Sequence, residues 1–279
     1  MISRNTKETR LTSITGCWLI YGPPDSGKTY SVLTCPEPIA LINSESKDPL
    51  VSLGVEASGK DITIIENANY YETMEWLNGQ VENPAYKTLY MDGLTVAMSN
   101  YRSFLADDRA QIRWDKLTDK EKAIAKDLVR DKLSIEMADW GLMAEMMLRQ
   151  TKLLNALSKK GVLVVATAID TAYPKWDKSL SAAPSLLGQD YSKQIHGLFD
   201  FIGYIVQGWR LGEDGTISPP RVSFHAPAGE YLARASGKLS RVRGNGPLNF
   251  TKMLQLINQE EVKNEATPMP EMSETPKLL

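Results

Sequence analysis

A run of eight residues near the start of the chain has the types and spacing needed to hold phosphate groups. It matches the pattern G-x-x-x-x-G-K-T, and with the next residue it comprises Gly22, Pro23, Pro24, Asp25, Ser26, Gly27, Lys28, Thr29 and Tyr30. In such a loop the glycines let backbone N–H groups face phosphate oxygens, the lysine reaches the β and γ phosphates, and the threonine hydroxyl ligates Mg²⁺. We therefore expect a nucleotide site here, with ATP and Mg²⁺ as cofactors. An ordinary Gly-Pro turn is the alternative.

A second carboxylate follows the apolar run 88–91. This residue is Asp92, 64 positions beyond Lys28. A loop of this kind needs an acid at the end of a nearby strand to hold the metal, so we expect Thr29 and Asp92 to share Mg²⁺. The alternative is a strand-ending turn, because Asp92-Gly93 is a good turn dipeptide. The glycine also means that the Asp-Glu pair, whose second acid polarises water in many such proteins, is absent, so a catalytic base must come from elsewhere.

The apolar run 39–43 leads to Ser44 and Glu45. The carboxyl ends of parallel strands meet at one edge of a sheet, where α/β proteins bind ligands. Glu45 is therefore the best candidate for the base, and a solvated loop acid is the alternative.

The order of these motifs resembles the core of the RecA-like recombinases: a phosphate loop, a strand ending in Ser-Glu, a further strand, and a strand ending in Asp. The resemblance implies that Glu45 activates the attacking water, with Lys28 and Asp92 beside it. Four further segments resemble phage-type RecA-like ATPases with a single AAA-labelled domain, a family implicated in single-strand annealing and recombination: 21–24, 91–95, 139–141 and 184–188. The likeness covers about residues 15–240.

The sequence departs from that family at two places. Asp25 stands where such loops commonly carry Gly or Ser, so we expect modest nucleotide affinity. The run 162–167 continues as Ala168-Ile169-Asp170, where the family usually places an amide or imidazole that senses the γ-phosphate. Thr167 and Asp170 are the alternatives for that role.

The resemblance also implies that residues 173–193 contact single-stranded DNA. Cations and aromatic rings alternate there, a combination that follows phosphates and stacks bases. The residues are Lys175, Trp176, Lys178, Tyr191 and Lys193, with Asp177 and Asp190 reducing the net charge to +1. A mobile active-site lid is an equal alternative.

The most basic stretch is 221–252, with six cations against one acid. It suits either a track for a phosphate backbone or a finger that reaches the nucleotide of a neighbouring subunit. Arg241 and Arg243, in a Gly-flanked loop, are the candidates for both roles. Surface solubility is the third interpretation.

Hydrophobic periodicity predicts the elements that must position these residues. Nearly continuous apolar runs predict strands at 17–21, 39–43, 62–65, 88–91, 162–167 and 201–206. A helix is expected over 140–160, capped by Asp139 and ended by Gly161. A hairpin is expected from 221–225 and 231–234, and a last helix over 248–257. Residues 101–139 hold nine acids and nine bases and predict a charged insertion, helical around 120–133.

Composition limits the remaining possibilities. The 279 residues are 42% hydrophobic with a net charge of -2, which excludes a histone-like protein, and two cysteines and two histidines are too few for structural zinc. The longest apolar stretch is too short for a membrane span, so we expect a cytoplasmic protein, in the host cytoplasm if phage-encoded. The expected regions are an extension over 1–14, a RecA-like domain over 15–259, and a disordered acidic tail over 260–279.

These observations predict a three-layer αβα RecA-like P-loop NTPase with a mainly parallel sheet and a C-terminal hairpin extension. The expected activity is ATP hydrolysis on single-stranded DNA in phage-type recombination, annealing or replication. The resemblance implies further copies of the chain and a single-strand-binding protein as partners. Two alternatives remain: a nucleotide or small-molecule kinase that uses Arg102, Arg109, Arg113 and Arg130 of the charged insertion as a lid, and an interaction module with little turnover.

Overall fold

The computed structural model describes residues 15–66, 69–125, 137–174, 177–187, 189–211, 217–226, 230–241 and 245–258. The predicted N-terminal extension and the predicted acidic tail both lie outside these ranges. No helix in the described part of the chain is long and apolar enough to cross a bilayer.

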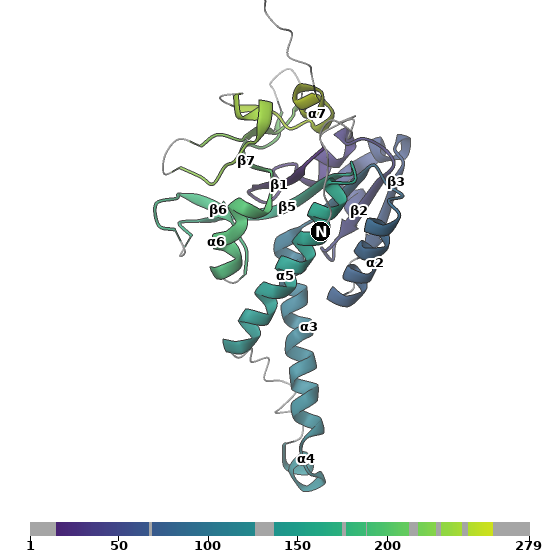
Figure 1. The fold of residues 1–279 in the computed structure, drawn as a ribbon, viewed down its shortest axis with the longest axis vertical. Helices are drawn as coiled ribbons and strands as arrows, with labels where there is room; N and C mark the ends of the chain where they lie inside the picture. Colours follow the sequence, from purple (N-terminus) through teal and green to yellow (C-terminus); the bar gives the residue numbers. More distant parts are fainter. Residues whose placement is uncertain are drawn as a thin grey trace, which may run out of the picture.

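A nine-stranded, mainly parallel sheet forms the centre of the molecule (Figure 1). Its main path runs β11-β10-β7-β1-β5-β4-β2-β3, and β6 pairs with β5. The six predicted strands are all present, as β1 Cys17–Gly22, β2 Ile39–Asn43, β3 Ile62–Glu66, β4 Thr88–Asp92, β5 Leu163–Ala172 and β7 Phe201–Gln207. They pair in parallel, so their carboxyl ends meet at one edge. β5 lies between β1 and β4.

The sheet is extended by antiparallel strands, but not by the expected hairpin. β10 Arg221–Ser223 pairs with β7 and with β11 Asn245–Pro247, whereas residues 231–234 form only isolated bridges to Ala182 and Ile202. The cause is tertiary: Leu232 is buried in the core, and its carbonyl accepts a hydrogen bond of 2.7 Å from Tyr21 Oη. The other short strands are β6 Ala182–Pro184, β8 Arg210–Leu211 and β9 Ile217–Ser218, the last two forming a separate two-stranded sheet.

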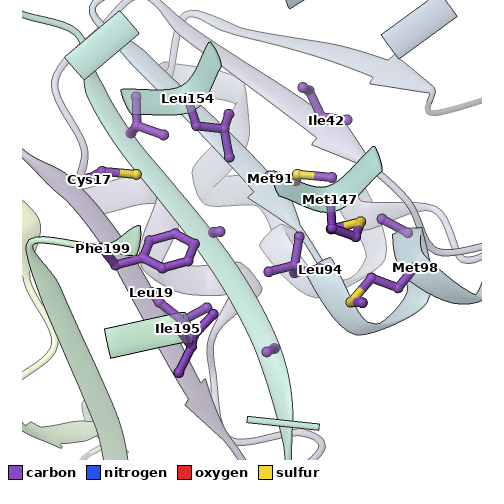
Figure 2. Close-up of a cluster of buried hydrophobic side chains, with 14 of the residues drawn as sticks. Cys17, Leu19, Ile42, Met91, Leu94, Met98, Met147, Leu154, Ile195 and Phe199 are labelled. Atoms are coloured by element: carbon purple, nitrogen blue, oxygen red, sulfur yellow. The ribbon is translucent and has the colours of Figure 1, made fainter. Parts of the chain in front are cut away.

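Helices cover both faces of the sheet, which makes the three layers expected from the sequence. Alternate residues of each strand point to opposite faces: Cys17, Leu19 and Tyr21 of β1 enter one hydrophobic cluster, and Trp18 and Ile20 enter the other. Figure 2 shows part of the first cluster, where Met91 of β4 lies beside side chains of α3 and α5. The helices that pack into it are α2 Tyr70–Glu82, α3 Leu94–Asp115, α5 Met137–Ser158 and α6 Gln189–Leu198.

The opposite face is covered by shorter elements. Trp18 is fully buried there, stacked on Phe201 at 4.0 Å between ring centroids and edge-on to Phe250. The covering elements are the 3-10 helices η1 Thr29–Thr34, η2 Gly54–Gly59 and η4 Gly237–Arg241, with α1 Pro49–Leu53 and α7 Phe250–Asn258. The predicted last helix is thus present, beginning two residues later because Asn249 precedes it as a cap, its Oδ1 accepting from Lys252 N.

Two helical predictions are corrected by the structure. Asp139 lies inside α5 instead of capping it, and its Oδ1 accepts a 3.1 Å bond from Arg109 Nε of α3. α3 itself, which begins at Leu94 directly after Gly93, was not expected. It extends well away from the sheet, and α4 Asp119–Ala125 follows at its far end (Figure 1). The rest of the predicted 120–133 helix lies outside the described residues.

Candidate functional site

The phosphate loop lies at the carboxyl end of β1, whose last residue is Gly22. Two residues adopt the left-handed backbone region, Asp25 at φ 57° and Gly27 at φ 90°. Lys28 Nζ folds back over the loop and donates to the carbonyls of Gly22 at 2.9 Å and Pro23 at 2.6 Å. Burial lowers the pKa of the Lys28 ammonium, an effect that neighbouring carboxylates, Asp92 foremost, oppose.

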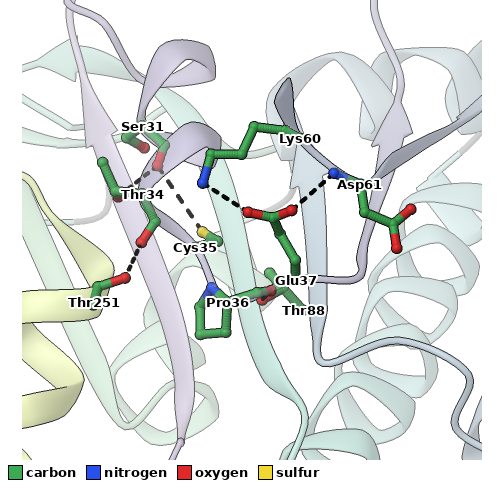
Figure 3. Close-up of polar contacts among 9 residues, drawn as sticks. All are labelled: Ser31, Thr34, Cys35, Pro36, Glu37, Lys60, Asp61, Thr88 and Thr251. Atoms are coloured by element: carbon green, nitrogen blue, oxygen red, sulfur yellow. Dashed lines mark hydrogen bonds and ion pairs between the residues drawn. The ribbon is translucent and has the colours of Figure 1, made fainter. Parts of the chain in front are cut away.

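The segment after the loop is a 3-10 helix, η1, held from behind by polar contacts (Figure 3). Ser31 Oγ donates to the Lys28 carbonyl at 2.7 Å, and Thr34 Oγ1 donates to the Ser31 carbonyl at 2.7 Å. α7 then holds Thr34 from the far end of the chain: Thr251 Oγ1 donates to the Thr34 carbonyl at 2.6 Å, and Phe250 N donates to Thr34 Oγ1 at 3.0 Å. The phosphate loop is therefore fixed at its base by the last described helix.

Asp92 is the last residue of β4 and is 6% exposed. Its two carboxylate oxygens have different partners: Thr29 Oγ1 donates to Oδ2 at 2.6 Å, and Thr167 Oγ1 of the intervening strand β5 donates to Oδ1. The carboxylate is thus held in one orientation from both sides. The contact between Asp92 and Thr29 passes the end of β5, because β5 lies between β1 and β4 in the sheet. The acid that the sequence predicts at the end of a strand near β1 therefore belongs to the second strand from β1.

Glu45 lies just beyond β2 on the same edge. Three contacts fix this turn: Ser44 N donates to the Asp92 carbonyl at 2.6 Å, Glu45 N donates to Asn43 Oδ1 at 3.1 Å, and Asn100 Nδ2 donates to the Ser44 carbonyl at 2.9 Å. A Cβ added at Gly93 would stand 3.8 Å from Glu45 Oε1. The Glu45 carboxylate thus occupies space beside the position where a second acid would follow Asp92.

Burial raises the pKa of the Glu45 carboxyl, and the charge of Asp92 raises it further, while Lys47 and Lys28 act in the opposite direction. A carboxylate with a raised pKa is a stronger base than an ordinary glutamate, which suits proton removal from water.

One cavity of about 1010 Å³ joins these groups. Its walls include residues from the phosphate loop, from the turn after β2, from the ends of β4 and β5, and from the segment after β7. Those with reactive or charged groups are Asp25, Lys28, Thr29, Glu45, Lys47, Asp48, Glu56, Asp92, Thr167 and Arg210. The structure therefore brings Lys28, Thr29, Glu45 and Asp92 to a single space.

Trp209 and Arg210 are among the cavity residues that the sequence reasoning missed. They directly follow Gly208, just beyond the carboxyl end of β7. A signal was available, because 201–206 was predicted as a strand of the same parallel sheet, and whatever follows its end falls on the ligand edge. Thr167, named as a possible γ-phosphate sensor, is 1% exposed and bonds to Asp92; the other alternative, Asp170, accepts from Tyr204 Oη at 3.4 Å.

The predicted nucleic-acid residues are less completely described. Lys178 and Lys193 are exposed, whereas Tyr191 is fully buried and its hydroxyl bonds to that of Thr151, so Tyr191 is not available for stacking on bases. Lys175, Trp176 and Arg243 lie outside the described residues. Arg241 is the last residue of η4.

The charged insertion does not cover the cavity with its described arginines. Thr95 and Val96, at the start of α3, line the cavity, and Arg109 lies about 21 Å further along that helix axis. Arg109 is instead bonded to Asp139 of α5. Arg102 is exposed on α3, and Arg130 lies outside the described residues.

The fold and the site define a class, the RecA-like P-loop fold: a mainly parallel αβα sandwich with the phosphate loop after β1 and an acid at the end of β4. More particularly, the chain belongs to the AAA domain family, whose sequence model matches residues 16–211. Among solved structures it is similar to the KaiC-like protein PH0186 from the hyperthermophilic archaeon Pyrococcus horikoshii OT3, at 14% identity and a TM-score of 0.37, covering 75% of this chain and 77% of that chain. No curated protein matched the sequence.

Proposed function

We propose that the chain hydrolyses ATP to ADP and phosphate and that it does so on single-stranded DNA, as an oligomer, in phage-type recombination, annealing or replication. The observation that carries the hydrolytic part is the meeting of Lys28, Thr29, Asp92 and Glu45 on one cavity. These are the groups that phosphoryl transfer to water requires: a cation for the phosphates, oxygen ligands for a metal, and a base.

The residues present fit Mg²⁺. This ion prefers hard oxygen ligands and keeps several waters, and Thr29 Oγ1 and Asp92 Oδ2 provide two such oxygens 2.6 Å apart at the end of the phosphate loop. Thr29 and Asp92 would hold the ion, which supplies neutralisation of charge on the phosphate oxygens when bound.

The chain's own groups then have distinct roles. Lys28 leaves its loop carbonyls to lie beside the β and γ phosphates. Glu45 orients a water and accepts a proton from it as the water oxygen attacks the γ phosphorus. The bond between that phosphorus and the oxygen that bridges the β and γ phosphates breaks, and ADP leaves. Thr167 keeps the Asp92 carboxylate in its orientation throughout.

Support for DNA as the partner comes from two exposed cations in the region that the resemblance nominates. Lys178 lies in the segment that joins β5 to β6 beyond the carboxyl edge of the sheet, and Lys193 lies on α6, which packs against α5. A DNA strand bound at Lys178 would lie at the edge of the sheet that carries the nucleotide cavity. Asp177 lies in the same segment, where it accepts from Ser179, so a DNA contact depends on the cations outweighing it.

The experiment measures phosphate release from Mg·ATP, with and without single-stranded DNA, for the parent, Lys28→Ala, Glu45→Gln and Lys178→Ala/Lys193→Ala chains. We expect stimulation by DNA in the parent, loss of hydrolysis in the first two variants, and loss of stimulation alone in the double variant. Glu145→Gln, a change at a partly exposed position on α5, serves as the control for Glu45→Gln.

Each result has a clear meaning. Phosphate release at the same rate with and without DNA would contradict the proposal that the chain acts on single-stranded DNA. Phosphate release that persists in Glu45→Gln would show that Glu45 is not the base. Appearance of a phosphorylated acceptor in place of free phosphate would favour the kinase, and no turnover at saturating ATP would favour the interaction module.

A further inference from the structure

The segment that follows β7 lies directly against the phosphate loop. A Cβ added at Gly208 would stand 3.3 Å from Ser26 Cα, and one added at Gly27 would stand 2.2 Å from Trp209 Nε1. Trp209 also packs edge-on against Tyr30, with 4.7 Å between ring centroids. Glycine at both positions is what allows this approach, so the two segments fit each other closely.

Arg210 comes next in the chain and lines the same cavity as Lys28, Asp92 and Glu45. It begins β8, which pairs with β9 through Arg210 and Ser218 in a small sheet outside the main one. Its side chain is exposed, and its guanidinium has no hydrogen-bond or ion-pair partner among the residues that the structure describes. Within the described part of the chain, no protein group therefore competes with a ligand for the planar guanidinium.

The charge of the cavity gives that guanidinium a role. Five carboxylates and three cations line its described walls. The carboxylates belong to Asp25, Glu45, Asp48, Glu56 and Asp92, and the cations to Lys28, Lys47 and Arg210. A triphosphate entering this acidic space needs cations, and an arginine holds phosphate oxygens through two parallel N–H donors.

We propose that Arg210 contacts the phosphates of the bound nucleotide from within the same chain, and that Trp209 is the positioning residue that fixes it against the phosphate loop. This inference rests on the proposed function, since it requires that the cavity bind ATP. It differs from a finger supplied by a neighbouring subunit, because every contact lies in one chain.

The test measures binding of Mg·ATP and of inorganic tripolyphosphate to the full chain by calorimetry. We expect Arg210→Ala to weaken both ligands about tenfold or more, the change expected on losing a charge-assisted hydrogen bond, and Arg210→Lys to recover part of the loss. Arg149→Ala is the matched control, an exposed arginine on α5 that forms an ion pair with Glu145, and should bind like the parent.

Trp209 is tested by a double-mutant cycle. Trp209→Phe, which keeps an aromatic ring beside Tyr30, should recover part of the binding that Trp209→Ala loses. In a Trp209→Ala background, Arg210→Ala should weaken binding much less than tenfold, because the arginine is no longer held in place. If Trp209 had only a structural role, Trp209→Ala would weaken binding by the same factor in the parent and in Arg210→Ala. If Trp209→Ala fails to fold, the Arg210 variants and a Trp209→Leu background carry the test.

The outcomes separate this inference from the proposed function. A parent chain that does not bind Mg·ATP contradicts the proposed function. A parent that binds, with Arg210→Ala binding equally well, overturns the inference alone. If Arg210→Ala lost ATP binding but bound tripolyphosphate like the parent, the inference would also be overturned, since the arginine would then act on the nucleoside.

Discussion

Thr29 Oγ1 and Asp92 Oδ2 are 2.6 Å apart, although 63 positions separate the two residues in the sequence. The contact crosses β5, and Thr167 of that strand holds the other oxygen of Asp92. Two strands, β4 and β5, and the 3-10 helix η1 thus combine to fix one carboxylate beside the phosphate loop. A carboxylate fixed in this way needs little reorganisation when a metal ion arrives, which is the condition for strong electrostatic stabilisation.

Asp92→Asn keeps the size of the side chain and removes its charge. We expect hydrolysis to fall by about 100-fold or more, with a higher Mg²⁺ concentration needed for half-maximal rate. Phosphate release titrated with Mg²⁺ measures both quantities. An unchanged magnesium dependence would contradict a metal-binding role for Asp92.

Thr167→Val removes the hydroxyl that donates to Asp92 and leaves a buried carboxylate oxygen without that partner. We expect the free energy of unfolding to fall by about 1–3 kcal/mol, and the turnover number to fall as well. Urea denaturation gives the first and steady-state kinetics the second. Thr171→Val, nearer the far end of β5 and partly exposed, is the comparison and should lose little of either.

The pKa of Glu45 sets a prediction for pH. Because burial and Asp92 raise this pKa, the base is protonated, and so inactive, at a higher pH than an ordinary glutamate would be. The rate should therefore fall on the acid side at a pH above the usual glutamate range, and it should stay level as pH rises through neutrality. Lowering the repulsion by Asp92→Asn should move this acid limb to lower pH, which a pH–rate profile of the residual activity can measure.

Substitution of Gly203 tests how tightly β7 packs against β10. A Cβ at this position would lie 2.6 Å from atoms of both Phe224 and Val222, so Gly203→Ala should destabilise the chain by about 1–3 kcal/mol. Gly79→Ala is the matched control, because Gly79 lies in α2 with nothing within 4 Å of the added carbon. It should be neutral or stabilising by up to about 1 kcal/mol. Thermal melts of the two variants would contradict this if they shifted alike.

The part of the fold that could be predicted is the part with a local signal. The six strands were found because each is a run of mostly apolar residues, a feature that the partly exposed edge strand β3 shares with the buried strands, and the residues at or beyond their ends led to Lys28, Asp92 and Glu45. α3 was missed although Leu94, Ala97, Met98 and Tyr101 have helical spacing, since the charges beyond them drew the boundary at 101.

Pairing between distant segments could not be predicted in the same way. Residues 231–234 look like a strand that should join β10, but burial of Leu232 and the Tyr21 hydroxyl hold them elsewhere. Arg210 belongs to no motif, and its place after the predicted strand 201–206 indicates only that it falls on the ligand edge; its position beside the phosphate loop depends on a segment nearly two hundred residues earlier in the chain. Nothing local to either segment reports such a contact.

The anchoring of η1 by α7 has a consequence for the order in which the protein folds. Thr251 of α7 holds Thr34, at the end of the turn that follows the phosphate loop, from 217 positions further along the chain. Contacts of such long range form late, after most of the chain has condensed. The phosphate loop therefore acquires the support that shapes it, and with that support the ability to hold a nucleotide, only after α7 has packed against η1.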